Sequence, residues 1–183
     1  MASSRMSKLS DTLRENKIDH ALLTSLASVR YFAGHTAPIE IGPSPFAPLA
    51  GALAWVKDEE PALLLADSES AEDVAAKLNT QRFPGYTYDR PLRSLEELTT
   101  LLVHVFRRVP SSTVGVELTE LPAFVLENLR SNCSQLNFQD VTSRLAGLRV
   151  IKEQEEIEAI RSALELCDLG QATVKKRISP GMT

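Results

Sequence analysis

The sequence contains few of the residues that hold small proteins together covalently or through metal ions. Cys133 and Cys167 are the only cysteines, and they lie in separate expected elements without a Cys-x-x-Cys spacing. Neither a disulfide framework nor a zinc site is expected, and both cysteines are interpreted as small apolar residues. The fold must therefore depend on an apolar core, which a chain of 183 residues with 43% hydrophobic content can supply.

An excess of positive charge is also missing. The net charge is -4, and lysine and arginine are scattered among acidic residues rather than gathered in one stretch. Because binding to a phosphate backbone needs a basic surface, no nucleic-acid partner is expected.

Long apolar runs do not occur either. The longest one, residues 49–56, is less than half of what a membrane-spanning helix requires, and the polar start of the chain lacks the apolar centre of a signal peptide. A cytoplasmic protein without a membrane partner is therefore expected. The sequence also shows no internal repeat and no low-complexity segment.

Hydrophobic periodicity predicts strands that alternate with helices. An amphipathic helix at 4–17 precedes a buried strand at 21–23, a turn, and a hairpin with strands at 52–56 and 62–66. The later elements are a helix at 68–78, a strand at 86–88, a helix at 94–109, a strand at 113–118, a helix at 121–131 and a strand at 136–138. This order predicts an α/β fold with a mixed sheet of about six strands and helices on both faces.

Two helices have marked starts. Ser94 and Glu97 have the spacing of a capping box, in which each side chain accepts a hydrogen bond from the other residue's backbone. A helix at 153–178 begins with glutamates and ends with three cations at 175–177, which is the charge order that a helix dipole favours. Pro180 then prevents the helix from continuing.

The chain is expected to divide near Leu145. Residues 1–145 would form the α/β domain, and residues 146–183 a linker and a helical tail whose apolar face has no partner within the tail. Since an exposed apolar stripe favours association, a complete small protein that acts alone is the least favoured interpretation.

The histidines and serines form no recognisable catalytic pattern. His20 begins a buried strand and His104 lies within the helix at 94–109, and neither belongs to a His-Glu-x-x-His or His-Cys motif. No Gly-x-Ser-x-Gly turn and no glycine-rich phosphate loop occurs. The glutamates at 153–158 are explained by a helix start rather than by a metal site.

The segment at 35–48 is the best candidate for contact with a ligand. It contains four prolines and a glycine, and a loop of this length inside a compact domain is more often functional than idle. His35 opens the segment directly after Gly34, where a rigid element can hold an exposed polar group in place. The alternative is a solvated loop residue without a role.

Residues 28–34, with the sequence Ser-Val-Arg-Tyr-Phe-Ala-Gly, resemble the Asn-Ile-Arg-Tyr-Leu-Thr-Gly signature of the prolidase, aminopeptidase P and creatinase family. Residues 148–152 (Leu-Arg-Val-Ile-Lys) and 180–183 (Pro-Gly-Met-Thr) resemble the domain junction of the same family. The resemblance spans the whole chain. It implies the family's N-terminal domain, with a mixed six-stranded sheet, at 1–145, and a linker with only the first helix of an absent catalytic domain at 146–183.

A metal-dependent hydrolase is the parent protein that this resemblance implies. Family members cleave the bond before proline, or a related C–N bond in creatine, with two divalent metal ions (Mn, Co or Zn) held by two Asp, one His and two Glu. Those five ligands would lie beyond Thr183. No catalytic residue, metal ligand or cofactor is therefore expected in this chain, which alone should be catalytically silent.

The same resemblance implies a role for the segment after Gly34. In dimeric relatives this loop reaches the partner subunit's active site and helps to set substrate length, so His35 and Glu40 are expected to contact substrate in trans. The implied partners are the chain's own catalytic domain, a second copy in a homodimer and a small peptide or amide substrate. A chaperone-like interaction module of the same fold, without metal ligands, is the alternative, and the sequence after Thr183 would decide between them.

Overall fold

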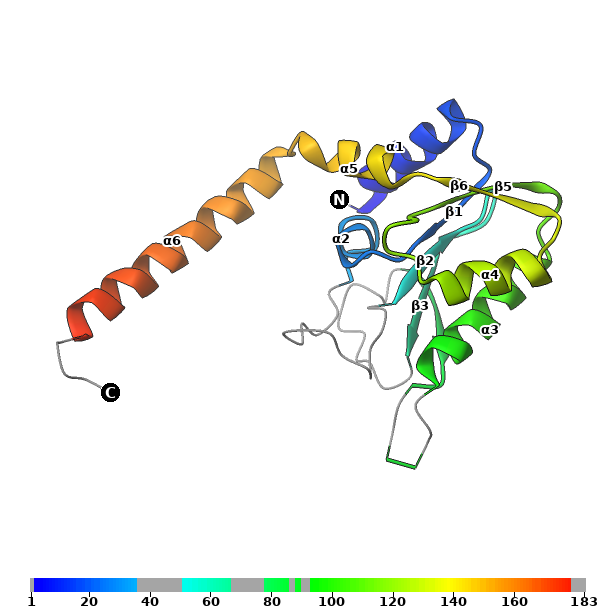
Figure 1. Cartoon of the computed structure of the whole chain (residues 1–183). Helices are drawn as coiled ribbons and strands as arrows, with labels where there is room; N and C mark the ends of the chain where they lie inside the picture. The colour runs from blue at the N-terminus through cyan, green and yellow to red at the C-terminus, as the bar shows by residue number, and fades with distance from the viewer. Residues whose placement is uncertain (1, 36–50, 67–77, 86–87, 90–92, 179–183) are drawn as a thin grey trace. The chain divides into compact units, whose positions relative to one another are not determined.

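The computed structural model describes residues 2–35, 51–66, 78–85, 88–89 and 93–178 (Figure 1). The chain separates into two compact units, Met1–Leu148 and Arg149–Thr183. The helix expected at 68–78 lies almost entirely outside the described residues, as does the segment after His35.

One six-stranded sheet forms the centre of the first unit (Figure 1). β2 runs antiparallel to both of its neighbours, whereas the β1–β5, β5–β6 and β3–β4 pairs are parallel. The sheet is therefore mixed, as the hairpin and the alternation of strands with helices predict. The order across the sheet is β4 (Asn79–Phe83), β3 (Ala62–Ala66), β2 (Ala52–Trp55), β1 (His20–Leu23), β5 (Ser112–Val116) and β6 (Leu136–Asp140).

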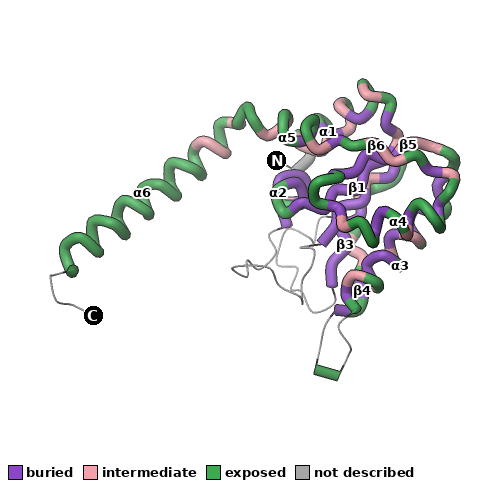
Figure 2. The backbone as a smooth tube through the Cα atoms, viewed as in Figure 1, coloured by how far each residue is buried: buried purple, intermediate pink, exposed green. Residues whose placement is uncertain are grey.

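Helices cover both faces of this sheet, whose inner strands are largely buried (Figure 2). Each layer of helices encloses its own apolar core with the sheet. Helices α3 (Ser94–Arg107) and α4 (Ala123–Asn132) pack on one face, while α1 (Ala2–Glu15), the short helices α2 and η1, and α5 (Thr142–Val150) pack on the other. Neighbouring strand residues point into different cores, so that Leu22 and Leu23 of β1 belong to opposite ones. Burial on both faces explains why β3 and residues 21–23 of β1 are apolar.

The strand expected at 86–88 lies mostly outside the described residues, and Tyr88, the part of it that is described, is not in a strand. The structure forms β4 before Pro84, from the sequence Asn-Thr-Gln-Arg-Phe, and pairs it in parallel with β3 at the edge of the sheet. Tyr88 lies in a turn with a fully exposed side chain, and the two residues before it are not among those described. Only Phe83 of β4 is buried, so hydrogen bonding to β3 rather than an apolar pattern determines this strand.

The capping box expected at Ser94 and Glu97 is wrong. Arg93 is the N-cap of α3, and the buried Ser94 hydroxyl has no hydrogen-bond partner among the described residues. A capping box occurs instead at the start of α6 (Gln154–Arg177), where the side chains of Glu153 and Glu156 each accept a hydrogen bond from the other's backbone.

Helix α5 was not expected as a separate element. Its first residue, Thr142, donates hydrogen bonds from its backbone and hydroxyl group to Oδ1 of Asp140. These bonds, with the hydroxyl bond contributing most, hold the pKa of Asp140 below its usual value of 3.8. An aspartate just before a helical segment is the sequence signal that predicts such a start.

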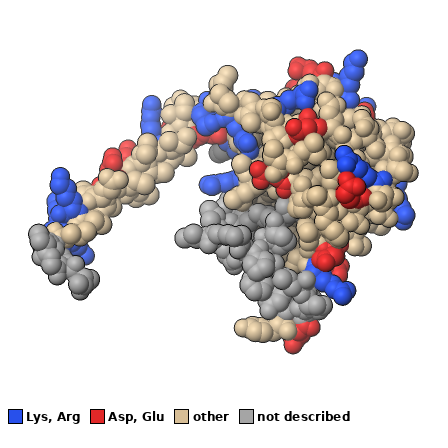
Figure 3. Space-filling view, viewed as in Figure 1, with Lys and Arg blue, Asp and Glu red and all other residues tan. Residues whose placement is uncertain are grey.

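The second unit consists mainly of α6, which confirms the helix expected at 153–178. It has no buried residue, and its cations gather near its end, as Figure 3 shows. Cys167 is exposed on this helix whereas Cys133 is buried, so the interpretation as a buried apolar residue holds for Cys133 alone. Within the described part of the chain, no helix is long and apolar enough to cross a membrane.

Candidate functional site

The chain turns into two short helices directly after β1. Ser25 is the N-cap of α2 (Leu26–Ser28), and its hydroxyl accepts a hydrogen bond of 3.0 Å from the Ser28 backbone nitrogen. α2 continues into the π-helix η1 (Val29–Ala33), a rare type of helix that is found frequently at functional sites. η1 ends at Gly34, whose φ of 70° lies in the left-handed region that glycine adopts without steric cost.

A buried carboxylate holds the first part of this turn. Glu117 directly follows β5 and is 2% exposed. Its Oε2 accepts hydrogen bonds of 2.9 Å from the backbone nitrogens of both Thr24 and Ser25. Its Oε1 accepts hydrogen bonds from the hydroxyl groups of Ser25 at 2.7 Å and Ser28 at 2.6 Å. These four bonds compensate a carboxylate that would otherwise be costly to bury.

The sheet explains how Glu117 comes to lie beside residues that precede it by about 90 positions. β1 and β5 are parallel neighbours, and Leu22 pairs with Val116. Their carboxyl ends therefore meet at the same edge, where β1 continues into Thr24 and β5 into Glu117. Glu117 was not expected as a site residue, although a single acidic residue at the end of an apolar strand is a usable signal.

Tyr31 anchors η1 to two helices of the same face. Its hydroxyl donates a hydrogen bond of 3.3 Å to the carbonyl oxygen of Leu148, and its own carbonyl oxygen accepts one of 3.2 Å from Arg5. The Arg5 guanidinium also lies 4.4 Å from the centre of the Tyr31 ring, which is a cation–π contact. Phe32 packs edge-on against Tyr31 and is fully buried.

His35 follows Gly34 and is only 5% exposed, so both the exposed position expected for it and the alternative of a solvated residue are wrong. Burial lowers the pKa of His35 below its usual value of 6.5, and the nearby Arg82 guanidinium acts in the same direction. The imidazole is therefore neutral at pH 7, with one donor and one acceptor nitrogen. Glu40, the second expected contact residue, lies outside the described residues.

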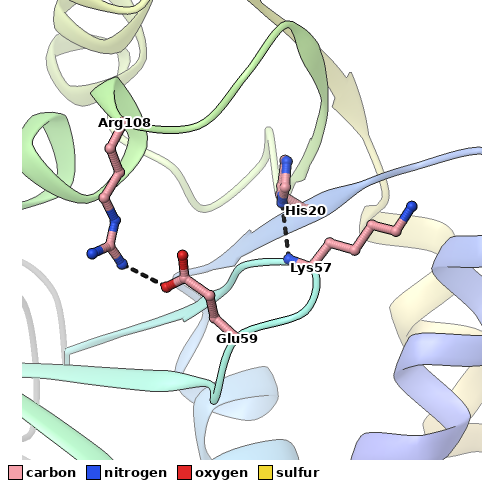
Figure 4. Close-up of polar contacts among 4 residues, drawn as sticks. All are labelled: His20, Lys57, Glu59 and Arg108. Carbon is pink, nitrogen blue, oxygen red and sulfur yellow. Dashed lines mark hydrogen bonds and ion pairs between the residues drawn. The ribbon is translucent and has the colours of Figure 1, made fainter.

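A second polar cluster lies at the opposite edge of the sheet, where β1 begins (Figure 4). Nδ1 of His20 accepts a hydrogen bond of 3.0 Å from the Lys57 backbone nitrogen, and Arg108 forms an ion pair of 2.6 Å with Glu59. These residues line an open depression of about 410 Å³. Burial lowers the pKa of His20, and the neighbouring Asp19 partly opposes this shift.

This second cluster contains no catalytic arrangement. The neutral His20 connects β1 to the turn of the β2–β3 hairpin, which is the structural role of a buried histidine. His104 is exposed on α3. Wherever side chains are described, no three of the His, Cys, Asp and Glu residues converge as metal ligands would.

The family model described as the creatinase/prolidase N-terminal domain matches residues 5–151. The chain belongs to this family. Its matched region contains all six strands, the signature residues 28–34 and Glu117, and it ends before α6. The expected resemblance is therefore confirmed, including the mixed six-stranded α/β fold.

One curated relative of this creatinase/prolidase N-terminal domain is more than twice as long as the matched region. The chain is 25% identical over 178 residues to the Xaa-Pro dipeptidase of Pyrococcus furiosus. The aligned region covers 97% of this chain but 43% of that protein. The chain thus spans less than half of the length of this curated relative.

Solved structures show the same fold. The prolidase from Pyrococcus horikoshii OT3 superposes with a TM-score of 0.67 at 20% identity, covering 98% of this chain and 44% of that one. The Xaa-Pro dipeptidase from Bacillus anthracis superposes with a TM-score of 0.72 at 18% identity, and the match covers 100% of this chain and 45% of that one. A proline dipeptidase structure from Streptococcus pneumoniae TIGR4 gives 0.58 at 19% identity and covers 80% of this chain and 97% of that chain.

Proposed function

We propose that this chain is the non-catalytic N-terminal part of a metal-dependent hydrolase that cleaves Xaa-Pro peptides, or a related amide such as creatine. The observation that carries the proposal is the match to a Xaa-Pro dipeptidase over 97% of this chain and only 43% of that protein. Residues 1–145 act as the domain itself. Residues 146–183 act as the linker and the first helix of the catalytic domain.

In this proposal, the metal ions and the reaction belong to the catalytic domain of the parent protein. Two divalent ions in the catalytic domain would polarise the scissile carbonyl and ionise a bridging water. The described residues of this chain offer no ligand set for such ions. Its contribution is therefore substrate contact and subunit assembly, not bond cleavage.

For substrate contact, the proposal assigns His35 and Glu40 to the partner subunit's active site in a homodimer. A neutral imidazole suits this task, because it can donate or accept one hydrogen bond to a peptide amide without attracting a counter-ion. The rigid turn before His35 supports the assignment, since a contact residue must be held in place to select substrate length. The dimer and a cytoplasmic location stay predictions.

A chimaera tests the proposed function. This chain replaces the matched N-terminal residues of the Pyrococcus furiosus Xaa-Pro dipeptidase, whose remaining sequence then supplies the rest of the enzyme. We expect the chimaera to bind metal and hydrolyse a Xaa-Pro dipeptide, whereas this chain alone does neither. Hydrolysis by this chain alone would contradict the proposal. A folded, metal-loaded chimaera without activity would favour the interaction module.

The substrate contact is tested in the same chimaera. His35→Ala should raise KM for the dipeptide more than it lowers kcat and leave the bound metal unchanged, because the lost contact serves binding rather than chemistry. His104→Ala is the matched control, since His104 is exposed on α3. Loss of metal and activity together in His35→Ala would point instead to a folding defect.

A further inference from the structure

We propose that Glu117 is a positioning residue whose buried carboxylate sets where His35 lies. The consequence for substrate binding rests on the proposed function, but the effect on His35 does not. The inference comes from three features of the described residues: the acceptors of Glu117, the continuity of the helix that leads to His35, and the weak local preference for that helix.

The carboxylate of Glu117 supplies the acceptors that the start of the turn needs. The first backbone N–H groups of a helix have no partner within it. The nitrogens of the N-cap residue Ser25 and of Thr24, which precedes it, donate to Oε2 of Glu117 at 2.9 Å. This bond pair fixes the direction in which the chain leaves β1.

The other carboxylate oxygen holds the end of the same turn. Oε1 of Glu117 accepts hydrogen bonds from the hydroxyl groups of both Ser25 and Ser28. Ser25 in turn accepts a hydrogen bond from the Ser28 backbone nitrogen. A single side chain from the end of β5 therefore ties down both ends of α2.

The position of Ser28 affects the position of His35 through the helix between them. α2 passes into η1 without a break, and η1 ends at Gly34, whose nitrogen donates a hydrogen bond of 3.0 Å to the Arg30 carbonyl oxygen. Tyr31 holds the middle of η1 against α1 and α5. His35 is the next residue, so a shift of Ser28 moves it.

Local sequence does not account for this helix. Val29, Tyr31 and Phe32 are residue types that favour strands, and π-helices are rare. The conformation must therefore be imposed by tertiary contacts. Those contacts include four hydrogen bonds to the Glu117 carboxylate, and charge-assisted hydrogen bonds are a strong type; Arg5 adds one more, to the carbonyl oxygen of Tyr31.

Substitutions should have graded effects. Ser28→Ala removes one of the four hydrogen bonds to the carboxylate. Glu117→Gln keeps an oxygen for the backbone nitrogens of residues 24 and 25 but turns an NH₂ group toward two serine hydroxyls, which lose their acceptor. Glu117→Ala removes all four bonds. Glu120→Gln is the matched control, because Glu120 lies three residues further along and is exposed.

The first experiment needs only the purified chain and no substrate. Glu117→Gln should speed amide hydrogen exchange of residues 29–34 by about 10-fold or more, the factor that corresponds to losing one hydrogen bond to a charged group. It should also shift the NMR signal of the His35 imidazole, with a smaller shift for Ser28→Ala and none for Glu120→Gln. Unchanged exchange and an unchanged His35 signal in Glu117→Gln would overturn the inference, and Ser28→Ala decides if the Glu117 variants do not fold.

The second experiment uses the chimaera and separates this inference from the proposed function. Glu117→Gln should raise KM in the same direction as His35→Ala, with kcat and bound metal retained. If His35→Ala leaves KM unchanged, the proposed substrate contact fails, whatever Glu117→Gln does to the His35 signal. If His35→Ala raises KM but Glu117→Gln changes neither KM nor that signal, the positioning role of Glu117 fails.

Discussion

His20 and His35 are both buried imidazoles with a pKa below the usual value of 6.5, and burial is the main cause for each. The folded state therefore favours their neutral form, while the unfolded state binds protons at ordinary pH values. The stability that these two residues contribute is complete above about pH 6.5. It is lost as the pH falls through their lower folded-state pKa values.

Urea unfolding at several pH values tests this consequence. We expect the free energy of unfolding to decrease as the pH falls below about 6.5, because unfolding then takes up protons. His20→Asn should weaken this dependence, since an asparagine can keep an acceptor for the Lys57 nitrogen but does not ionise. His104→Asn, a substitution at an exposed site, should leave the pH dependence unchanged. Equal pH dependence in all three proteins would contradict the assignment to buried histidines.

Glu117 shows why a site residue can escape sequence analysis. Its partners lie 89–93 residues away, and only the parallel pairing of β1 with β5 brings them together. His35, in contrast, was expected as a contact residue from local signals, because Gly34 marks a change of chain direction and residues 28–34 precede it; the contact itself stays a prediction. Even there, burial of the imidazole could not be foreseen, since it depends on packing across elements.

At the level of helices and strands, sequence predicted the elements that are rich in apolar residues, and also the edge strand β6, in which Leu136 is the one buried residue. The strands β2 and β3 and residues 21–23 of β1 lie inside the sheet and are apolar because helices cover both faces. The edge strand β4 has one buried residue and gave no such signal. The helix η1 also gave none, because its type depends on contacts outside it.

Gly115 in β5 offers a sharp test of packing on the sheet face that faces α5. A Cβ at this position would lie 2.8 Å from Cγ1 of Val141 and 3.2 Å from Cγ2 of Ile18. Gly115→Ala should therefore destabilise the fold by about 1–3 kcal/mol, the usual cost of overpacking a core. The measurement is the free energy of unfolding in urea.

A second glycine provides the control for that substitution. Gly147 lies in α5, and a Cβ there would meet no atom within 4 Å. Gly147→Ala should stabilise the protein by about 0.5–1 kcal/mol, because alanine loses less conformational entropy than glycine on entering a helix. Similar losses of stability in both variants would show that the close approach at Gly115 is not the cause.

At the scale of the whole molecule, the first unit should fold without α6. No residue of α6 is buried, and the family match ends at Ile151. A chain of residues 1–151 should therefore unfold within about 0.5 kcal/mol of the full chain, since exposed residues contribute little to stability. Urea unfolding followed by circular dichroism measures this difference. A loss of several kcal/mol would mean that residues 152–183 stabilise the α/β domain.

If the catalytic domain holds the metal ions, this chain alone should not bind them tightly. A site that activates water needs several side-chain ligands around each ion, and the described residues bring no three candidates together. Calorimetric titration of this chain with Mn²⁺, Co²⁺ or Zn²⁺ should therefore show no site with a Kd of about 1 µM or tighter, whereas the chimaera with the Pyrococcus furiosus enzyme should bind. Chelation should accordingly abolish hydrolysis by the chimaera without changing the unfolding of this chain. A tight site in this chain would contradict the assignment of the chemistry to another domain.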